Sequence, residues 1–435
     1  MFTWKGKWGE DVTAGLRIVR RSGKETAVYE NLPVNLFQAF QSQADLRPDH
    51  TAIINIDGKA YSYRQLLVMT EDLASALHSE YDVHAGSHVG VLLYNSIEFV
   101  VAYLAIIKLG AVYVSLPGKF QKPELFSLAE RADLDFLICE KKFDTWFAER
   151  SELTRILCST EENGYGFAGL VARCKNRGQD EAAGGLGEDP VILMFTSGTT
   201  SRSKGVQLTN SNVMYSVLAY IRTLHLDADE TAIVTTPMYH ITGLVCIIAT
   251  LLTCGGCVCI LRKVDPEAII RCLTEHEVTF FHASPTVFGM FLEEGARQNY
   301  PAIKSLKKFA CGSGNMPPEN IRRLKQWIPG ADFHTIFGMT ETSGAGTIFP
   351  CGAADSPYIG SSGIPMPDLE IQILDDEDRE LACGKTGEIC VRGGFVLDRY
   401  YKLDSPDILP DGWLRTGDIG YVNEAGFLYI VDRKK

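Results

Sequence analysis

The segment from Met194 to Val206 carries residue types that suit phosphate binding. An apolar run leads into a stretch that is rich in hydroxyl side chains and glycine and that contains Lys204. Small residues let backbone N–H groups approach phosphate oxygens, hydroxyls add hydrogen-bond donors, and the lysine adds positive charge. The Walker pattern GxxxxGK[ST] is absent, so the likeness to that loop is physical only. A short Ser/Thr turn alone would indicate a solvated surface turn, whereas thirteen positions in this order favour a phosphate-binding loop.

The same segment is similar to the phosphate-binding loop of the adenylate-forming superfamily, which includes acyl-CoA synthetases, luciferases and the adenylation domains of peptide synthetases. That loop commonly reads TSGTTGxPKG, and Ser201 and Ser203 stand here where the family has glycine and proline. The resemblance implies that the segment binds the phosphates of ATP, that Lys204 takes part in catalysis and that Thr196 helps to hold Mg²⁺. The residues that it assigns to the nucleotide are Thr196, Ser197, Gly198, Thr199 and Thr200.

A second motif follows in the family's order. Residues Phe337, Gly338, Met339, Thr340 and Glu341 match the family's YGxTE, with phenylalanine in place of tyrosine. The resemblance implies that Thr340 holds the α-phosphate, that Glu341 carries Mg²⁺ and that the three residues before them line the nucleotide site. The chemistry agrees, because attack on the α-phosphate requires its charge to be neutralised and its geometry to be fixed.

Two further motifs complete the nucleotide site that the resemblance implies. Residues 413–418 read WLRTGD, and the family's aspartate, Asp418 here, binds both ribose hydroxyls. Alone, a TGD sequence indicates only a tight turn between strands. Gly312, Ser313 and Gly314 stand where the family contacts adenine, although by themselves they indicate a small-residue turn. The match at residues 387–393 is interpreted as structural.

His240 ends the sequence Pro237-Met238-Tyr239-His240, which matches the motif before the family's acyl pocket. A histidine titrates near physiological pH, so it could guide the incoming carboxylate or gate its channel. A single histidine after a strand is more often a satisfied loop residue, but its place in the motif order favours the functional interpretation.

The end of the chain, residues 430–435, reads IVDRKK. The resemblance implies that Arg433 contacts the ribose and phosphate of the nucleotide and that Lys435 occupies the family's interdomain hinge. A C-terminal domain normally follows, which assists adenylation and then rotates to build the site of thiol transfer. We therefore expect the chain to lack that domain, to bind ATP and acid, to form the adenylate slowly and not to complete the thioester alone.

The acid is expected to bind beside His240, residues 281–285, residues 311–314 and residues 338–344. These segments are mainly small and apolar and offer no fixed charge. Amino acid-activating domains carry an aspartate for the substrate amine, whereas this chain has Tyr-His-Ile-Thr at 239–242, which argues against an amino acid. A fatty or aryl acid remains, with a fatty acid slightly favoured because glycines leave room for a chain.

Three functions stay open at this point. An acid:CoA ligase, with ATP, Mg²⁺ and CoA as its cofactors, is favoured by the motif order. A second hypothesis is an adenylation domain that loads an aryl or fatty acid onto an acyl carrier protein. The third is a nucleotide-binding remnant without enzymatic activity, which the matching Thr196, Lys204, Glu341 and Asp418 make the least favoured.

These motifs require a scaffold of short apolar strands alternating with helices, as in parallel sheets covered on both faces. From about residue 357 the strands become shorter and turns more frequent. The predicted class is α/β, with two parallel-sheet subdomains and a smaller β-rich one. The expected ranges are an N-terminal extension at 1–33 that packs on the surface or frays, subdomains at 34–189 and 190–356, and a β-rich subdomain at 357–435.

The composition sets outer limits on function. A chain of 435 residues with 22% charged residues and a mean hydropathy of −0.01 is typical of a soluble globular protein. The net charge of −12 argues against nucleic-acid binding. No secretory pattern or membrane-spanning stretch is evident, and the twelve cysteines sit mainly in apolar segments, as Cys139, Cys246 and Cys390 do. Cys254, Cys257 and Cys259 form a cluster that could suggest a metal or redox site but leads into a short apolar strand. These cysteines are interpreted as structural, and the expected location is the cytoplasm.

Overall fold

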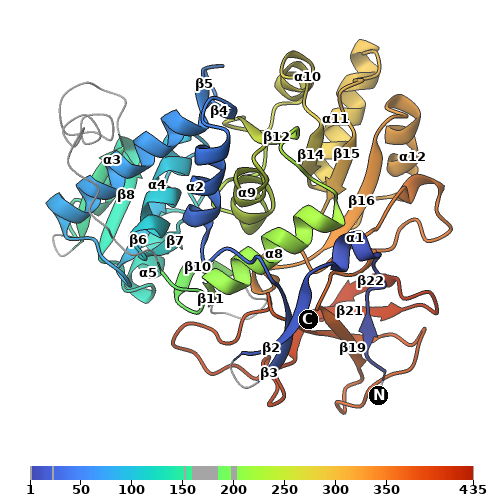
Figure 1. The fold of residues 1–435 in the computed structure, drawn as a ribbon. Helices are drawn as coiled ribbons and strands as arrows, with labels where there is room; N and C mark the ends of the chain where they lie inside the picture. Colours follow the sequence, from blue (N-terminus) through green and yellow to red (C-terminus); the bar gives the residue numbers. More distant parts are fainter. Residues whose placement is uncertain (1, 22–23, 151–152, 159–184, 197–202, 435) are drawn as a thin grey trace.

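The computed structural model describes residues 2–434 apart from residues 22–23, 151–152, 159–184 and 197–202. Within these residues the strands form sheets of six, nine, five and two strands. Helices pack on the six- and nine-stranded sheets, and the five-stranded sheet lies at one side of both (Figure 1). The predicted class is confirmed: two mainly parallel sheets with helices, and a β-rich part.

The six-stranded sheet has the order β11-β10-β7-β6-β8-β9. Its strands are parallel except for β11, which returns antiparallel to β10. Helix α4 (Ile97–Lys108) is buried on nearly every side, which explains why its sequence is apolar all round. The strands are β6 (His88–Leu92), β7 (Val112–Ser115), β8 (Phe136–Glu140), β9 (Thr154–Cys158), β10 (Pro190–Thr196) and β11 (Lys204–Thr209). The other helices nearby in sequence are α3 (Tyr63–Tyr81), α5 (Lys122–Arg131) and α6 (Lys141–Phe147).

The nine-stranded sheet has the order β18-β17-β16-β15-β14-β12-β13-β4-β5. The strands from β16 to β4 run parallel, so their carboxyl ends share one edge, and antiparallel strands complete both sides. The strands are β4 (Thr51–Ile54), β5 (Ala60–Ser62), β12 (Thr231–Val234), β13 (Cys257–Ile260), β14 (Phe280–Ala283), β15 (Lys308–Cys311), β16 (Asp332–Phe337), β17 (Thr347–Ile348) and β18 (Ile364–Pro365).

The helical elements of this part include a π-helix, η1 (Thr242–Ala249), which continues directly into α9 (Thr250–Cys254). Helix α8 (Asn210–Thr223) begins directly after β11, and Figure 1 shows it crossing the middle of the molecule. The remaining elements are α2 (Leu36–Leu46), α10 (Pro266–Glu275), α11 (Pro285–Gln298), α12 (Pro318–Trp327) and the 3₁₀ turns η2 (Thr340–Thr342) and η3 (Ala353–Asp355).

The five-stranded sheet is antiparallel throughout, with the order β1-β19-β20-β21-β22. Its first strand, β1 (Trp4–Lys5), comes from the N-terminal segment, so residues far apart in sequence share this sheet. The rest of that segment forms α1 (Glu10–Thr13) and the hairpin of β2 (Leu16–Arg21) and β3 (Lys24–Tyr29). The other strands of the sheet are β19 (Glu370–Leu374), β20 (Gly387–Arg392), β21 (Leu414–Val422) and β22 (Leu428–Arg433).

The sheets cross the boundaries expected from the sequence. Strands β4 and β5 precede residue 189 but belong to the nine-stranded sheet, because β4 pairs with β13. Strands β10 and β11 follow residue 189 but belong to the six-stranded sheet, because β10 pairs with β7. Strand pairing between distant segments is not visible in local patterns. As domain units, the ranges 34–189 and 190–356 stay a prediction.

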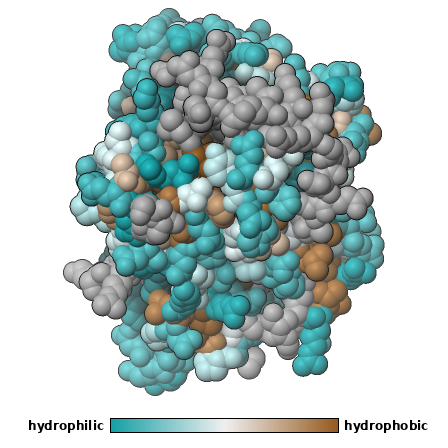
Figure 2. Space-filling model, turned by 90° about the vertical axis from the view of Figure 1, so that its left-hand side faces the viewer, coloured by the Kyte–Doolittle hydropathy of each residue, from teal (hydrophilic) through white to brown (hydrophobic). Residues whose placement is uncertain are grey.

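Two cysteines of the cluster, Cys257 and Cys259, lie in the buried strand β13, as a structural role requires. In the part of the chain that the structure describes, no helix is long and apolar enough to cross a membrane. The face in Figure 2 is mainly hydrophilic, with hydrophobic residues in small separate groups.

Candidate active site

A cleft of about 1030 Å³ lies between the carboxyl ends of the parallel strands and the five-stranded sheet. Its lining comes from the ends of β10, β15 and β16 and from strands β21 and β22. All of the predicted site residues that the structure describes line this cleft: Thr196, Lys204, His240, Gly312, Ser313, Gly314, Phe337, Gly338, Met339, Thr340, Glu341, Asp418 and Arg433. Ser197, Gly198, Thr199 and Thr200, like Lys435, lie outside the described residues.

The two ends of the predicted phosphate loop are held by a strand pair. Thr196 at the end of β10 is the antiparallel partner of Lys204 at the start of β11. The Lys204 ammonium forms an ion pair with Asp407 and lies 3.3 Å from Ser405 Oγ and 5.2 Å from the ring centre of Tyr400. Residues from the C-terminal third of the chain therefore hold the loop lysine in place.

Glu341 lies in the 3₁₀ turn that follows β16, and only 5% of it is exposed. Tyr400 donates a hydrogen bond from its hydroxyl to Glu341 Oε1 at 3.2 Å. Burial raises the pKa of this carboxyl, while the backbone, Tyr400 and the positive charge of Lys204 act against that shift. Gly338 is required just before this turn, because a Cβ there would lie 1.9 Å from the carbonyl oxygen of Gly344.

Asp418 lies within the long strand β21 and not in a tight turn. The carboxylate of Asp418 pairs with its cross-strand neighbour Arg433, with Oδ1 and Nε 3.3 Å apart. Burial raises the pKa of Asp418, and the charge of Arg433 opposes the shift. Gly417 before it has φ of +73°, a conformation that favours glycine and turns the strand at the cleft.

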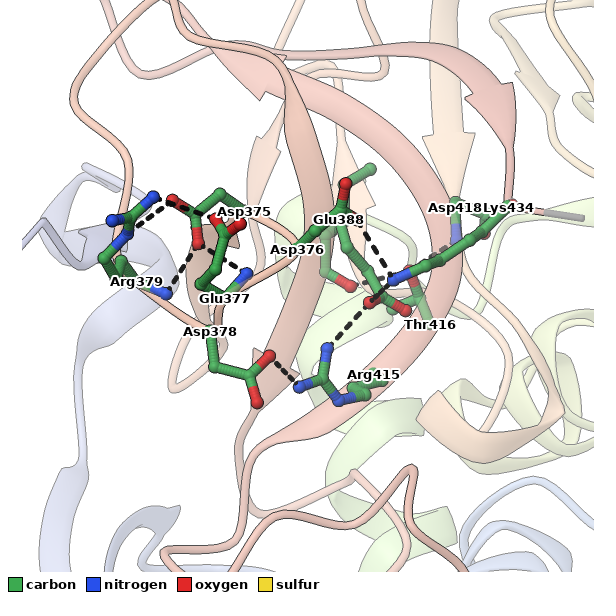
Figure 3. Close-up of polar contacts among 11 residues, drawn as sticks. Asp375, Asp376, Glu377, Asp378, Arg379, Glu388, Arg415, Thr416, Asp418 and Lys434 are labelled. Atoms are coloured by element: carbon green, nitrogen blue, oxygen red, sulfur yellow. Dashed lines mark hydrogen bonds and ion pairs between the residues drawn. The ribbon is translucent and has the colours of Figure 1, made fainter.

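A group of charged residues lies near Asp418, and Glu388, Arg415 and Lys434 of this group line the cleft (Figure 3). Glu388 Oε2 accepts hydrogen bonds from Arg415 Nη1 at 2.8 Å and from Lys434 Nζ at 3.0 Å. Figure 3 shows the two cations reaching the buried carboxylate of Glu388, with Asp378 on the outer side of Arg415. The Lys434 N–H also donates to the carbonyl of Gly417 at 2.7 Å. The end of β22 is therefore fixed to β20 and β21 beside the cleft.

His240 follows β12 and keeps contact with solvent in the open cleft. The Thr242 N–H donates to His240 Nδ1 at 3.3 Å, so the neutral ring carries its proton on Nε2. Loss of water around the ring, followed by the positive charge of Lys119, lowers the pKa of His240. The ring is therefore a neutral donor near pH 7.

Some expectations for the acid site need correction. Phe281 is buried in a cluster of aromatic side chains instead of lining the cleft, because alternate residues of β14 face opposite sides. Its neighbour His282 lines the cleft. Lys119 also lines the cleft and lies close enough to act on His240. The expectation that the acid site carries no fixed charge is therefore wrong at Lys119.

Sequence reasoning missed several residues of the cleft. Tyr400 and Asp407 contact Glu341 and Lys204, but they lie in a stretch that matches no motif quoted for the family. Lys119 lies outside every quoted motif, and Lys434 lies in the segment IVDRKK, where the resemblance gives roles only to Arg433 and Lys435. Glu388 falls in the motif that was interpreted as structural, and its contacts with two cations agree with a supporting role.

Comparison with known proteins agrees with this geometry. The sequence pattern of the family described as AMP-binding enzyme matches residues 40–401. The chain is 28% identical to indoleacetate–CoA ligase of Aromatoleum aromaticum, over 92% of this chain and 79% of that protein. It is 26% identical to 4-coumarate–CoA ligase 3 of Arabidopsis thaliana, over 96% and 76% of the two chains.

Solved structures of similar fold add to these matches. One is described as a long-chain-fatty-acid CoA ligase from Rhodopseudomonas palustris, with a TM-score of 0.82, 25% identity and coverage of 92% of this chain and 99% of that one. Another is o-succinylbenzoate CoA synthetase from Bacillus subtilis in complex with ATP and magnesium ion. Its TM-score is 0.80 at 25% identity, over 91% of this chain and 79% of that one.

Proposed function

The chain belongs to the family of AMP-binding enzymes, and from this premise we propose that it is an acyl-CoA ligase. A carboxylate oxygen attacks the α-phosphorus of ATP, the bond to pyrophosphate breaks, and pyrophosphate leaves. The thiol of CoA then displaces AMP from the acyl carbon and loses its proton to solvent. The observation that carries the proposal is the convergence of the described motif residues on one cleft.

The nucleotide is proposed to bind along β21, β22 and the turn after β16. Asp418 would accept hydrogen bonds from the ribose hydroxyls, and Arg433 would lie near the phosphates. Thr340 would hold the α-phosphate, with the small residues 312–314 beside the adenine. The chemistry supports these positions: the Asp418 carboxylate can accept hydrogen bonds from hydroxyls, and the Arg433 guanidinium can pair with a phosphate.

The residues present fit a bound Mg²⁺. Glu341 offers a buried carboxylate whose charge is disfavoured by burial, so a cation beside it would compensate. Thr196 adds a hydroxyl oxygen on the same cleft. Protein sites for Mg²⁺ commonly use one or two carboxylates together with substrate phosphates. When bound, the ion supplies neutralisation of phosphate charge.

Lys204 is proposed to change partner when ATP binds. In the structure its ammonium pairs with Asp407. A nucleotide phosphate carries more charge than one carboxylate and would compete for the same cation. Asp407 would therefore hold the lysine in position until the substrate arrives.

The acid is proposed to enter beside His240. The Nε2–H of this ring is a donor for a carboxylate, and Lys119 attracts the negative charge. The acid is proposed to be a fatty or an aryl acid. The glycines of the wall slightly favour a fatty acid, whereas relatives named as ligases of indoleacetate and 4-coumarate favour an aryl acid. The cytoplasmic location is a further part of the proposal that rests on cysteine usage alone.

Acid-dependent exchange of labelled pyrophosphate into ATP tests the first step directly. A panel of fatty and aryl acids should show exchange with one class, and acyl-sulfamoyl adenosines of that class should raise the melting temperature, because they bind only the native chain. Asp418→Ala should remove both effects. Absence of exchange together with absence of any shift by ATP or the analogues would overturn the proposal. Trapping with hydroxylamine, CoA or an acyl carrier protein then identifies the acceptor.

A further inference from the structure

Tyr220 of α8 and His282 of β14 form a buried polar pair behind the wall of the cleft. Tyr220 Oη lies 2.9 Å from His282 Nδ1, and neither residue is more than 2% exposed. His282 also lines the cleft. His282 falls within the range 281–285 expected beside the acid, but neither it nor Tyr220 has been given a role in the reaction described so far.

The protonation of the pair follows from its surroundings. Burial, and then the nearby His240, lowers the pKa of His282 to about 3, so the ring is neutral. If Nδ1 carried the ring proton, the hydroxyl proton of Tyr220 would be left in the core without an acceptor among the described residues. An unpaired buried donor is costly. Tyr220 therefore donates to Nδ1, and the ring proton sits on Nε2.

Nε2–H is directed to the space beside Gly312. A Cβ at Gly312 would lie 3.5 Å from Nε2, and Gly312 also lines the cleft. Among the described residues, Nε2 has no hydrogen-bond partner. The side chain is thus almost wholly buried but keeps one unpaired donor on its cleft side.

Apolar side chains line the cleft near this donor, together with His240, which is close enough to act on His282. Cys246 of η1 and Ile336 of β16 line the cleft, and both are buried. Gly344 lies close against η1, because a Cβ there would be 2.6 Å from Cys246 Sγ. A hydrocarbon group that filled this space would strip water from Nε2–H and return no hydrogen bond.

We propose that His282 is a specificity-determining residue, whose Nε2–H donates a hydrogen bond to an oxygen on the acyl or aryl group of the acid. The substrate class is then an acid that bears a hydroxyl, alkoxy or oxo group, in preference to a pure hydrocarbon acid. This inference rests on the proposed function and narrows its substrate. Tyr220 acts as a positioning residue that fixes the tautomer.

Matched acid pairs test the inference. The probes are cinnamic acid and its 2-, 3- and 4-methoxy derivatives, and octanoic acid and its oxo derivatives, each also as the acyl-sulfamoyl adenosine. In the unaltered chain, at least one oxygen-bearing acid should bind about tenfold more tightly than its hydrocarbon partner, the ratio of one retained hydrogen bond. The double variant Tyr220→Phe, His282→Phe removes both polar partners and leaves no buried donor unpaired. In this double variant the oxygen-bearing acid and its hydrocarbon partner should bind with nearly equal affinity.

The controls separate this inference from the proposed function. ATP binding should be equal in the unaltered chain and the double variant, which shows that the nucleotide site and the fold are intact. Tyr220→Phe alone should reduce the preference without abolishing it. Equal affinity within every pair, or a preference that survives in the double variant, would overturn the role of His282. A loss of affinity that is the same for all acids would also overturn it, and exchange with hydrocarbon acids would still support the ligase.

Discussion

Glu341 holds a carboxylate in the cleft at 5% exposure, beside Tyr400 and within the field of Lys204. Glu341→Gln keeps the volume of this side chain and an oxygen that can accept the bond from Tyr400, but it removes the charge that a divalent cation needs. We expect the melting temperature without ligand to stay the same or rise, since burial disfavours the charge. We expect Mg²⁺·ATP to bind at least about tenfold more weakly.

Calorimetric titration of Mg²⁺·ATP, compared with ATP in the presence of a chelator, measures this effect. Glu319→Gln in α12 is a matched control, because Glu319 is exposed and does not line the cleft. If Mg²⁺ increases the ATP affinity of the variant as much as that of the unaltered chain, the assignment of Glu341 to Mg²⁺ is wrong.

His282 makes the stability of the fold depend on pH on the acid side. Its folded-state pKa is about 3, whereas an unfolded histidine titrates near 6.5. Between these values the unfolded chain binds a proton that the folded chain does not, so stability falls as pH decreases from 6.5 towards 3. From pH 6.5 to pH 5 the loss from this ring is about 2 kcal/mol. The double variant Tyr220→Phe, His282→Phe should lack this part of the loss.

Urea unfolding at pH 5, 5.5, 6, 6.5 and 7 measures the free energy of unfolding for both chains. The difference between the chains should change steadily across this range, because all other titrating groups are shared. If the free energies of unfolding of the two chains differ by the same amount at every pH, then His282 has an ordinary histidine pKa in the folded state.

At the scale of elements, helices α11 and α12 contact each other through a glycine. A Cβ at Gly295 would lie 2.2 Å from Cη2 of Trp327, whereas a Cβ at Gly289 of the same helix would meet no atom within 4 Å. Gly295→Ala should therefore cost about 1–3 kcal/mol of stability, since the helices must separate or Trp327 must turn. Gly289→Ala should stabilise by up to about 1 kcal/mol, as alanine does in an open helix position.

Thermal and urea unfolding of the two variants check this pair, with each serving as the control for the other. If the two alanines change the free energy of unfolding equally, helix propensity alone determines the effect, and the contact between residue 295 and Trp327 adds no destabilisation.

The same scale shows which elements local sequence can predict. Strands such as β6 and β14 are short, mainly apolar runs of the kind that the sequence predicts for a covered parallel sheet. A pattern of apolar runs does not predict strand β11, because Lys204–Thr209 contains lysine, glutamine and threonine and its place depends on pairing with β10. The π-helix η1 is apolar at almost every position, so no helical spacing distinguishes it.

The candidate site divides in the same way. Glu341 and Asp418 stand in contiguous motifs, and both line the cleft. Asp407 and Tyr400 reach the cleft through contacts between elements far apart in the chain, which no local pattern records. His282, in contrast, lies within the range 281–285 that was expected beside the acid. Prediction from one sequence therefore found the residues in motifs and missed those that support them.

At the scale of the whole molecule, the N-terminal segment joins the two parts that border the cleft. Tyr29 stacks on Tyr215 of α8 at 5.4 Å, and Tyr215 stacks on Phe395 at 5.6 Å. Trp8 donates from Nε1 to the carbonyl of Pro365 at 2.7 Å. Instead of fraying, the segment packs against α8 and against the residues that lead into the five-stranded sheet.

Asp368 connects strand β3 of the N-terminal segment with Gly394. Its carboxylate accepts hydrogen bonds from Thr26 Oγ1 at 2.5 Å and from the N–H groups of Ala27 and Gly394 at 2.7 and 2.8 Å. Burial raises the pKa of Asp368, and the hydrogen bonds from these three donors oppose the shift.

Asp368→Ala would leave three donors without their acceptor at a partly buried place, and we expect a loss of about 2–4 kcal/mol. Thr26→Val is the graded comparison, because it removes one donor at equal volume and should cost about 1 kcal/mol. If the segment joins the two parts that border the cleft into one cooperative unit, Asp368→Ala should show a single calorimetric transition at a lower temperature. ATP should raise that temperature almost as much as in the unaltered chain. An early transition that ATP does not shift would instead mean that residues 1–33 unfold separately from the part of the molecule that binds the nucleotide.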